Sequence, residues 1–72
     1  MSDNGTISIT LNGEPREIPA GTTIKGLFDL LELSPEGLLV ERNLTVVHRS
    51  AFATETFESG DAVELMRLIG GG

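Results

Sequence analysis

Residues 6–11, Thr-Ile-Ser-Ile-Thr-Leu, alternate strictly between polar and apolar side chains. Because successive side chains of a strand point to opposite faces, this pattern predicts a strand with one buried face. Asn12-Gly13 follows directly, and this dipeptide favours a two-residue hairpin turn whose central residues need positive φ. We therefore expect a hairpin, with a second strand at about residues 14–18. Pro15 cannot donate a ladder hydrogen bond, so we expect it at the end of a strand or on an edge strand.

A helix is expected after this hairpin. Thr22 or Thr23 can act as the N-cap, because a hydroxyl oxygen can accept a bond from the free amides of the first turn. Apolar side chains then recur at helical spacing and predict one buried stripe, made by Ile24, Leu27, Phe28 and Leu31 and widened by Leu30. Pro35 disfavours a helical conformation at Ser34, so the helix is expected to end near Leu33.

The rest of the pattern predicts three short strands at residues 38–42, 45–47 and 62–68. Asn43-Leu44 and Ser59-Gly60-Asp61 are the turns before the last two of them. Residues 50–57 give no clear element, but Phe52 and Phe57 are expected to fill the core there. Strands on both sides of one helix predict an α+β fold, a mixed sheet of four to five strands packed on that helix.

The chain is too short for more than one domain, so residues 1–72 are expected to fold as a single unit. It has no cysteine, and its core must supply the stability that disulfides give many small domains. The formal charge is −6 and the five basic residues are scattered, which disfavours nucleic acid and anionic membranes as partners. Without an apolar run of membrane-spanning length or a signal peptide, we expect a cytoplasmic protein, monomeric on its own.

The residues for catalysis are missing. His48 is the only histidine, and without cysteine or a second histidine neither a metal cluster nor a nucleophilic triad can be assembled. His48 is therefore expected on the surface. The chain is predicted not to be an enzyme and to bind no cofactor or metal of its own.

Several short motifs, in this order, carry a family resemblance: Leu11-Asn12-Gly13, Gly21-Thr22-Thr23-Ile24, Val40-Glu41-Arg42-Asn43, Ser59-Gly60-Asp61 and the final segment from Asp61 to Gly72. With them the chain resembles the ubiquitin-like sulfur carriers from about residue 6 to residue 72, and most closely the ThiS family of thiamin biosynthesis. The resemblance implies a ubiquitin-like β-grasp fold with a flexible glycine tail. Residues 1–5 are expected to be flexible as well, and residues 69–72 to be the functional tail.

The resemblance also implies a role for the tail. An ATP-using enzyme of the ThiF type, similar to ubiquitin-activating enzymes, would adenylate the carboxylate of Gly72. Sulfur from a cysteine-derived persulfide would then replace AMP and leave a thiocarboxylate, whose sulfur a thiazole synthase of the ThiG type takes. The protein is then a carrier and co-substrate, and ATP is bound by the activating enzyme.

Elementary chemistry supports this reading of Gly70-Gly71-Gly72. A carboxylate acylates poorly without a leaving group such as AMP, and an activating site that excludes water favours a narrow channel. Glycine has no side chain to block such a channel and accepts almost any φ. Three residues reach at most roughly 10 Å beyond the folded domain, which is enough to enter a cleft. The alternative is a frayed glycine end without chemistry.

Apolar residues beside the tail are candidates for partner docking. If Val63 and Leu65 face the helix, Met66 and Leu68 point outward, and with Ile69 they would form a contact surface. The alternative is a broader core that covers both Met66 and Leu68.

Other functions remain open from the sequence. The small subunit of molybdopterin synthase has a similar fold and tail, but tends to carry prolines where this chain has Met66-Arg67-Leu68-Ile69. A ubiquitin-like protein modifier needs the same adenylation and ends in an isopeptide bond. A non-covalent β-grasp binding module, from a different class, would make no chemical use of the tail.

Overall fold

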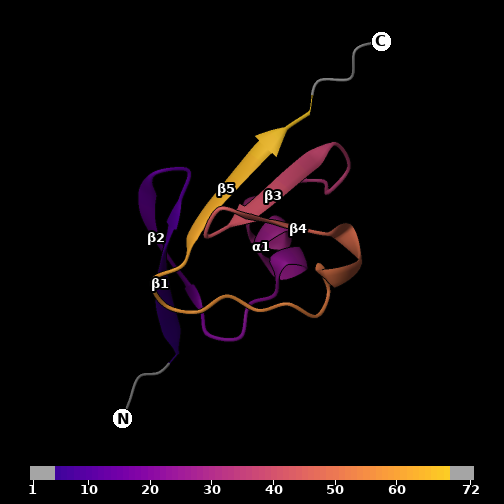
Figure 1. Ribbon diagram of the computed structural model, residues 1–72. Coiled ribbons are helices and arrows are strands. Elements are labelled where there is room, and N and C mark those ends of the chain that lie inside the picture. Colours follow the sequence, from indigo (N-terminus) through magenta and orange to yellow (C-terminus); the bar gives the residue numbers. More distant parts are fainter. Residues whose placement is uncertain (1–4, 69–72) are drawn as a thin grey trace.

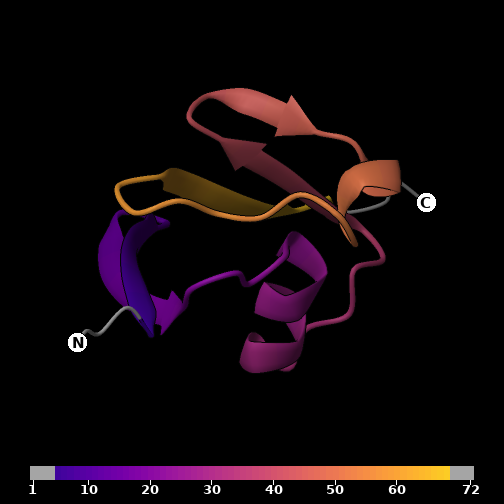
Figure 2. The ribbon, with the colours of Figure 1, turned by 90° about the horizontal axis from the view of Figure 1, so that it is seen from below.

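The computed structural model describes residues 5–68, which form five strands, one α-helix and a short 3-10 helix (Figure 1). The elements are β1 (Thr6–Leu11), β2 (Glu14–Pro19), α1 (Ile24–Leu31), β3 (Leu38–Arg42), β4 (Thr45–Val47), the 3-10 helix η1 (Arg49–Ala51) and β5 (Ala62–Arg67). The strands make one sheet in the order β2-β1-β5-β3-β4, in which only the β1–β5 pair among the described strands is parallel. Figure 2 shows α1 on one face of this sheet, which confirms the predicted α+β architecture.

Both hairpins turn through two residues with positive φ. Asn12 (φ 49°) and Gly13 (φ 85°) connect β1 to β2, as the sequence predicts. Asn43 (φ 52°) and Leu44 (φ 70°) connect β3 to β4 in the same way. β2 is an edge strand, so the prediction from Pro15 is confirmed.

Helix α1 begins as predicted and ends early. The Thr23 hydroxyl caps it by accepting a 3.0 Å hydrogen bond from the amide of Gly26. The helix stops at Leu31 and not near Leu33, because Glu32 takes the left-handed conformation with φ 58°. The amide of Leu33 then donates to the carbonyl of Phe28 over 2.9 Å, and this bond satisfies a carbonyl that the helix end would leave free.

The core lies between α1 and the sheet and consists of Ile9, Ile18, Ile24, Leu27, Phe28, Val40, Phe52, Phe57 and Val63. The rings of Phe28 and Phe52 meet edge to face, with 5.3 Å between their centroids. Phe52 and Phe57 are buried as predicted, although η1, just before Phe52, was not. Leu30 does not widen the buried stripe: its side chain is 51 % exposed, because it projects from the side of α1 that faces away from the sheet. No helix within residues 5–68 is long and apolar enough to span a membrane.

Candidate functional site

Strand β5 leads the chain toward its glycine tail from the middle of the sheet, between β1 and β3. The backbone pairing continues one residue past the strand, where the Leu68 amide donates to the Gly37 carbonyl over 2.7 Å. The predicted tail residues Gly70, Gly71 and Gly72, and Ile69 before them, lie outside the described residues. The fold therefore fixes the chain up to Leu68, directly before the predicted tail.

Asn12 fastens the middle of β5 from the neighbouring hairpin. Its amide donates to the Val63 carbonyl over 2.9 Å, which extends the pairing with β5 beyond the end of β1. Its side-chain oxygen accepts from the Leu65 amide at 2.8 Å, and its side-chain nitrogen lies 3.4 Å from the Leu65 carbonyl. Beyond the end of β1, the Asn12 side chain therefore forms the hydrogen bonds to Leu65 that a longer strand would form with its backbone.

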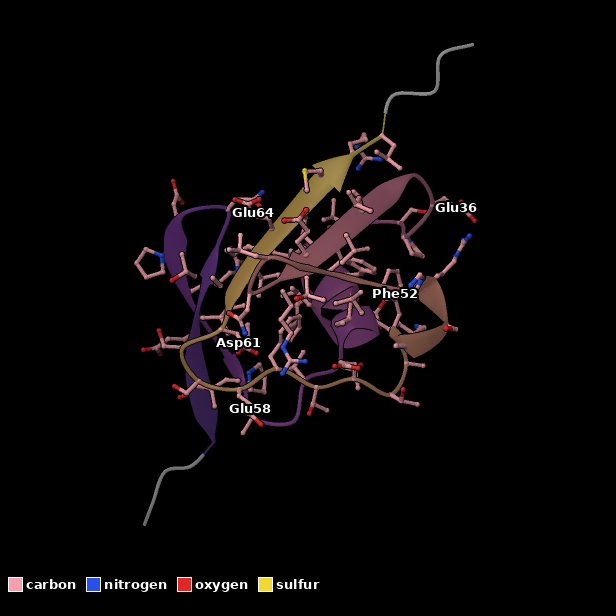
Figure 3. The ribbon with its side chains drawn as sticks, in the orientation of Figure 1. Glu36, Phe52, Glu58, Asp61 and Glu64 are labelled. Carbon is pink, nitrogen blue, oxygen red and sulfur yellow. The ribbon has the colours of Figure 1, made fainter. Side chains whose placement is uncertain are left out.

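A polar cluster holds the start of β5 (Figure 3). The Asp61 carboxylate, in a residue only 7 % exposed, accepts from Arg42 Nε at 2.9 Å, from the Asn43 side-chain amide at 3.1 Å and from the Glu58 backbone amide at 2.8 Å. A second nitrogen of the same guanidinium donates to Glu55 at 2.7 Å. The cluster therefore ties β3, the turn after it and the loop before β5 into one unit.

The surroundings of Asp61 lower its pKa. Burial alone would raise the pKa of this carboxyl, because desolvation disfavours the charged form. The hydrogen bonds from Glu58 and Asn43, together with the positive charge and hydrogen bond of Arg42, outweigh burial and bring the pKa below its ordinary value. Asp61 is thus a charged structural group that needs its partners.

The outer face of the sheet, the face turned away from α1, carries apolar side chains on β3, β4 and β5. Leu39 and Met66 are cross-strand partners, are both half-buried, and do not belong to the core cluster. Leu68 is 58 % exposed and Val46 is 45 % exposed. We call these four residues the outer apolar patch. Val63 and Leu65 face the core, so the strand has the orientation that the docking prediction requires.

Two glutamates interrupt this face. Glu41 on β3 and Glu64 on β5 stand directly opposite each other in the register, and both alternate with the buried Val40 and Val63. Like charges at directly opposed positions destabilise a sheet. Neither carboxylate forms an ion pair with another group among residues 5–68. The outer face therefore combines apolar surface with unneutralised negative charge.

The structure brings together residues that the sequence had left apart. Arg42 and Asn43 from one predicted motif meet Asp61 from another, and the bond network explains why those residue types stand there. The hydrogen bond between the Asn12 side chain and Leu65 on β5 was not predicted from the sequence. Asn12-Gly13 is already explained by the hairpin turn, so nothing in the pattern indicated a second role for Asn12. His48 is exposed, as predicted. The docking role of Met66 and Leu68 stays a prediction.

Comparison with known proteins gives this arrangement a family. The model of the ThiS family matches residues 9–72. The crystal structure of a thiamine biosynthesis protein (ThiS) from Geobacter metallireducens superimposes with a TM-score of 0.78 at 33 % identity, covering 92 % of this chain and all of that one.

Two sequence relatives differ in length. A thiazole synthase of Magnetococcus marinus is 42 % identical over 66 residues, which are 92 % of this chain but 20 % of that protein. The chain thus spans about a fifth of that relative. An uncharacterized protein, ycf40, of Porphyra purpurea is 30 % identical over 69 residues, with 96 % of this chain and 97 % of that one covered. The family match covers nearly the whole chain, from β1 to the glycine tail, and the chain belongs to the ThiS family.

Proposed function

We propose that the chain is the sulfur carrier for thiazole formation in thiamin biosynthesis. The observation that carries the proposal is the match of the ThiS family through residue 72, on a fold that pairs the backbone out to Leu68, so that only Ile69 stands between the paired backbone and the glycine run in the sequence. Four residues beyond Leu68 can reach at most about 14 Å. That reach suits a tail that enters the active site of another protein while the domain stays outside.

The proposed chemistry takes place on the Gly72 carboxylate. One of its oxygens attacks the α-phosphorus of ATP in an activating enzyme of the ThiF type, and pyrophosphate leaves. A persulfide sulfur then attacks the activated carbonyl carbon and displaces AMP. Cleavage of the remaining S–S bond by a thiol leaves the thiocarboxylate. The chain itself supplies the reacting carboxylate and the docking surface, so it acts as a co-substrate and not as an enzyme.

The receiving partner in this proposal is a thiazole synthase of the ThiG type. The support comes from the Magnetococcus marinus relative, a thiazole synthase that contains a segment 42 % identical to this chain. A carrier-like segment and a synthase within one polypeptide are expected to cooperate. The same observation favours thiazole formation over the molybdopterin branch for this chain.

Docking of the domain is assigned to the outer apolar patch and to Ile69, which follows it in sequence. Met66 lies on β5 and Leu68 follows the strand directly, so contact there would place the tail at a fixed distance from the partner's reacting groups. Glu41 and Glu64 on the same face favour a partner that offers arginine or lysine side chains, since a cation would relieve their mutual repulsion.

The test is the intact mass of the chain after incubation with ATP, a ThiF-type enzyme and a persulfide donor. The expected change is the mass difference between one sulfur and one oxygen atom, located on Gly72 by fragmentation. Removal of Gly72 should abolish the change and leave the thermal melt as it was. An unchanged mass of the full chain would favour a non-covalent β-grasp binding module instead.

A further inference from the structure

The two edges of the sheet differ in what they offer to another strand. In a two-residue hairpin the residues next to the loop bond to each other, and every second residue points its N–H and C=O outward. On β2 the outward positions are Pro15, Glu17 and Pro19, and the two prolines have no N–H to donate. On β4 the outward residue is Val46, and neither its N–H nor its C=O meets a partner among residues 5–68. The two prolines thus flank Glu17 and interrupt the β2 edge, whereas the outward residue of β4 has no proline beside it.

A cleft runs beside this open edge. It has a volume of about 510 Å³ and lies between β4 and the segment that carries η1, with Val46, Val47, His48, Ser50 and Ala51 in its walls. Figure 1 shows the helical turn of η1 directly after β4, and residues of both elements line the cleft. An extended peptide is narrow enough to lie in such a cleft.

The charge along this edge is opposite to that of the rest of the chain. Eleven residues of the chain are Asp or Glu, but residues 43–54 contain none. The same stretch holds Arg49 and His48, and neither forms an ion pair within the described part of the chain. Glu55 also lines the cleft, but its carboxylate is paired with Arg42 at 2.7 Å. A segment that brings a carboxylate would therefore find basic side chains without an acidic partner at the end of β4.

Apolar surface lies at the same place. Leu44 is 90 % exposed and Val46 is 45 % exposed. Leu44 also has φ 70°, a left-handed conformation that costs a branched side chain energy and that glycine would adopt freely. The Asn43 bonds to Asp61 and Ala62 hold this turn in place, so Leu44 is presented in a fixed position. The positive φ of Leu44 completes the turn, but the exposure of its side chain contributes nothing to the core.

We propose that the edge of β4 binds an extended segment of a partner protein, which adds a strand to the sheet. The segment exchanges hydrogen bonds with Val46, covers Leu44 and Val46 with apolar side chains, and places a carboxylate near Arg49 or His48. This is β-strand addition, in which the backbone supplies affinity and alternate side chains supply specificity. The site shares Val46 with the outer apolar patch but includes neither Leu39, Met66 and Leu68 nor the tail, so it does not depend on the proposed sulfur chemistry.

The probe is a six-residue peptide, Asp-Val-Thr-Val-Thr-Asp, acetylated and amidated at its ends. Titrated into the full ¹⁵N-labelled chain, it should shift the amide signals of residues 44–49 and slow the hydrogen exchange of the Val46 amide. Val46→Pro removes the outward N–H, and it also fixes φ and shortens the apolar side chain. It should weaken binding by about tenfold or more, since a hydrogen-bond partner is left unpaired. The matched Val46→Thr keeps the N–H and should stay within about twofold of the parent.

Charge provides a second, independent arm. A peptide with lysine in place of both aspartates should bind more weakly than the acidic peptide. Arg49→Glu should reverse this preference, and this variant decides the question if Val46→Pro does not give a cooperative melt. A chain without Gly72 should bind the acidic peptide like the parent, which separates this site from the carrier function.

Several results would overturn the proposal. One is the absence of signal shifts for the acidic peptide up to millimolar concentration. Others are equal affinity of a folded Val46→Pro variant and shifts confined to β2 or to Leu39, Met66 and Leu68. Protection of the Val46 amide that rises with chain concentration in the absence of peptide would assign the edge to a second copy of the chain.

Discussion

Asn12 combines a backbone role with a side-chain role. Its φ of 49° builds the first hairpin, and its side chain holds Leu65 on β5, far away in the sequence. Glycine would keep the turn, since it adopts positive φ without cost, but would lose both side-chain bonds to Leu65. The two roles can therefore be separated by one substitution.

We expect Asn12→Gly to lower the free energy of unfolding by about 1–2 kcal/mol, since each neutral hydrogen bond contributes roughly 1 kcal/mol. The Leu65 amide should exchange faster with solvent, while the Gly13 turn stays intact. Asn12→Asp is the matched control, because it keeps the acceptor for the Leu65 amide. Denaturant unfolding and amide exchange measure the two effects, and an unchanged Leu65 exchange rate in Asn12→Gly would contradict the assigned role.

Asp61 makes the stability depend on pH at the acid end. Its folded pKa lies below the ordinary value of 3.8, so the unfolded chain takes up the proton first as the pH falls. The stabilisation by Asp61 is therefore fully present above the unfolded pKa and is lost as the pH falls through the folded pKa. We expect Asp61→Asn to cost roughly 2 kcal/mol at neutral pH, the value of hydrogen bonds to a charged group.

The difference between the parent and Asp61→Asn should shrink as the pH is lowered through the acid range, because the parent's carboxyl then becomes neutral as well. Urea melts at a series of pH values measure it. Glu58→Gln serves as control, since Glu58 contributes its backbone amide to the cluster and not its side chain. A constant difference at all pH values would show that the charge of Asp61 is not what stabilises the cluster.

In the tail, a substitution should change the reaction with the activating enzyme without changing the stability of the domain. Gly71→Val adds a β-branched side chain that restricts φ and would obstruct a narrow channel. We expect ATP–pyrophosphate exchange with the activating enzyme to fall strongly while the melting temperature stays the same. Gly5→Val adds the same side chain where no atom lies within 4 Å, and should leave both quantities unchanged. Normal exchange by Gly71→Val would argue against a narrow channel.

Strand β5 carries the docking prediction. Met66→Asp places a charge in the outer apolar patch, and truncated hot spots in interfaces typically cost about 2 kcal/mol or more. We expect affinity for the activating enzyme to fall by more than about tenfold, with the melting temperature within a few degrees of the parent. Thr10→Asp adds the same charge on the outer face of β1 and should have little effect on affinity.

Calorimetric titration and thermal melts distinguish the outcomes for Met66. A collapse of stability would mean that Met66 packs as part of the core. An unchanged affinity would move the docking surface elsewhere.

At the scale of the whole molecule, one small core has to carry the fold. Phe28 is 1 % exposed and is the aromatic partner of Phe52. Phe→Ala in a core costs about 3–5 kcal/mol, while a small domain has little more than about 5 kcal/mol in total. We expect Phe28→Ala to be largely unfolded at room temperature. Leu30→Ala, on the exposed side of α1, should stay within about 0.5 kcal/mol of the parent.

The sequence predicted the strands well, because turn residues separate them and residues 6–11 alternate strictly. β1, β3 and β4 occupy the predicted residues, and β2 and β5 each differ by one residue at their C-terminal end. The sequence could not predict that α1 ends before Glu32. A glycine often marks the left-handed residue that ends a helix, whereas a glutamate in that conformation cannot be recognised from its residue type. Leu30 matched the apolar stripe by residue type alone, and only the sheet decides which side of a short helix is covered. Long-range bonds such as Arg42–Asp61 depend on strand order, which local patterns do not encode.

The parallel pairing of β1 and β5 has a mechanical consequence. The first and last strands of the described chain are neighbours that run in the same direction. Tension between the two ends of the chain therefore loads their hydrogen bonds in shear, all at once, and does not open them one after another. The bonds from the Thr10 amide to Asp61, just before β5, and from the Asn12 amide to Val63 on β5 carry this load. A partner that draws on the tail would thus pull along the strongest direction of the domain.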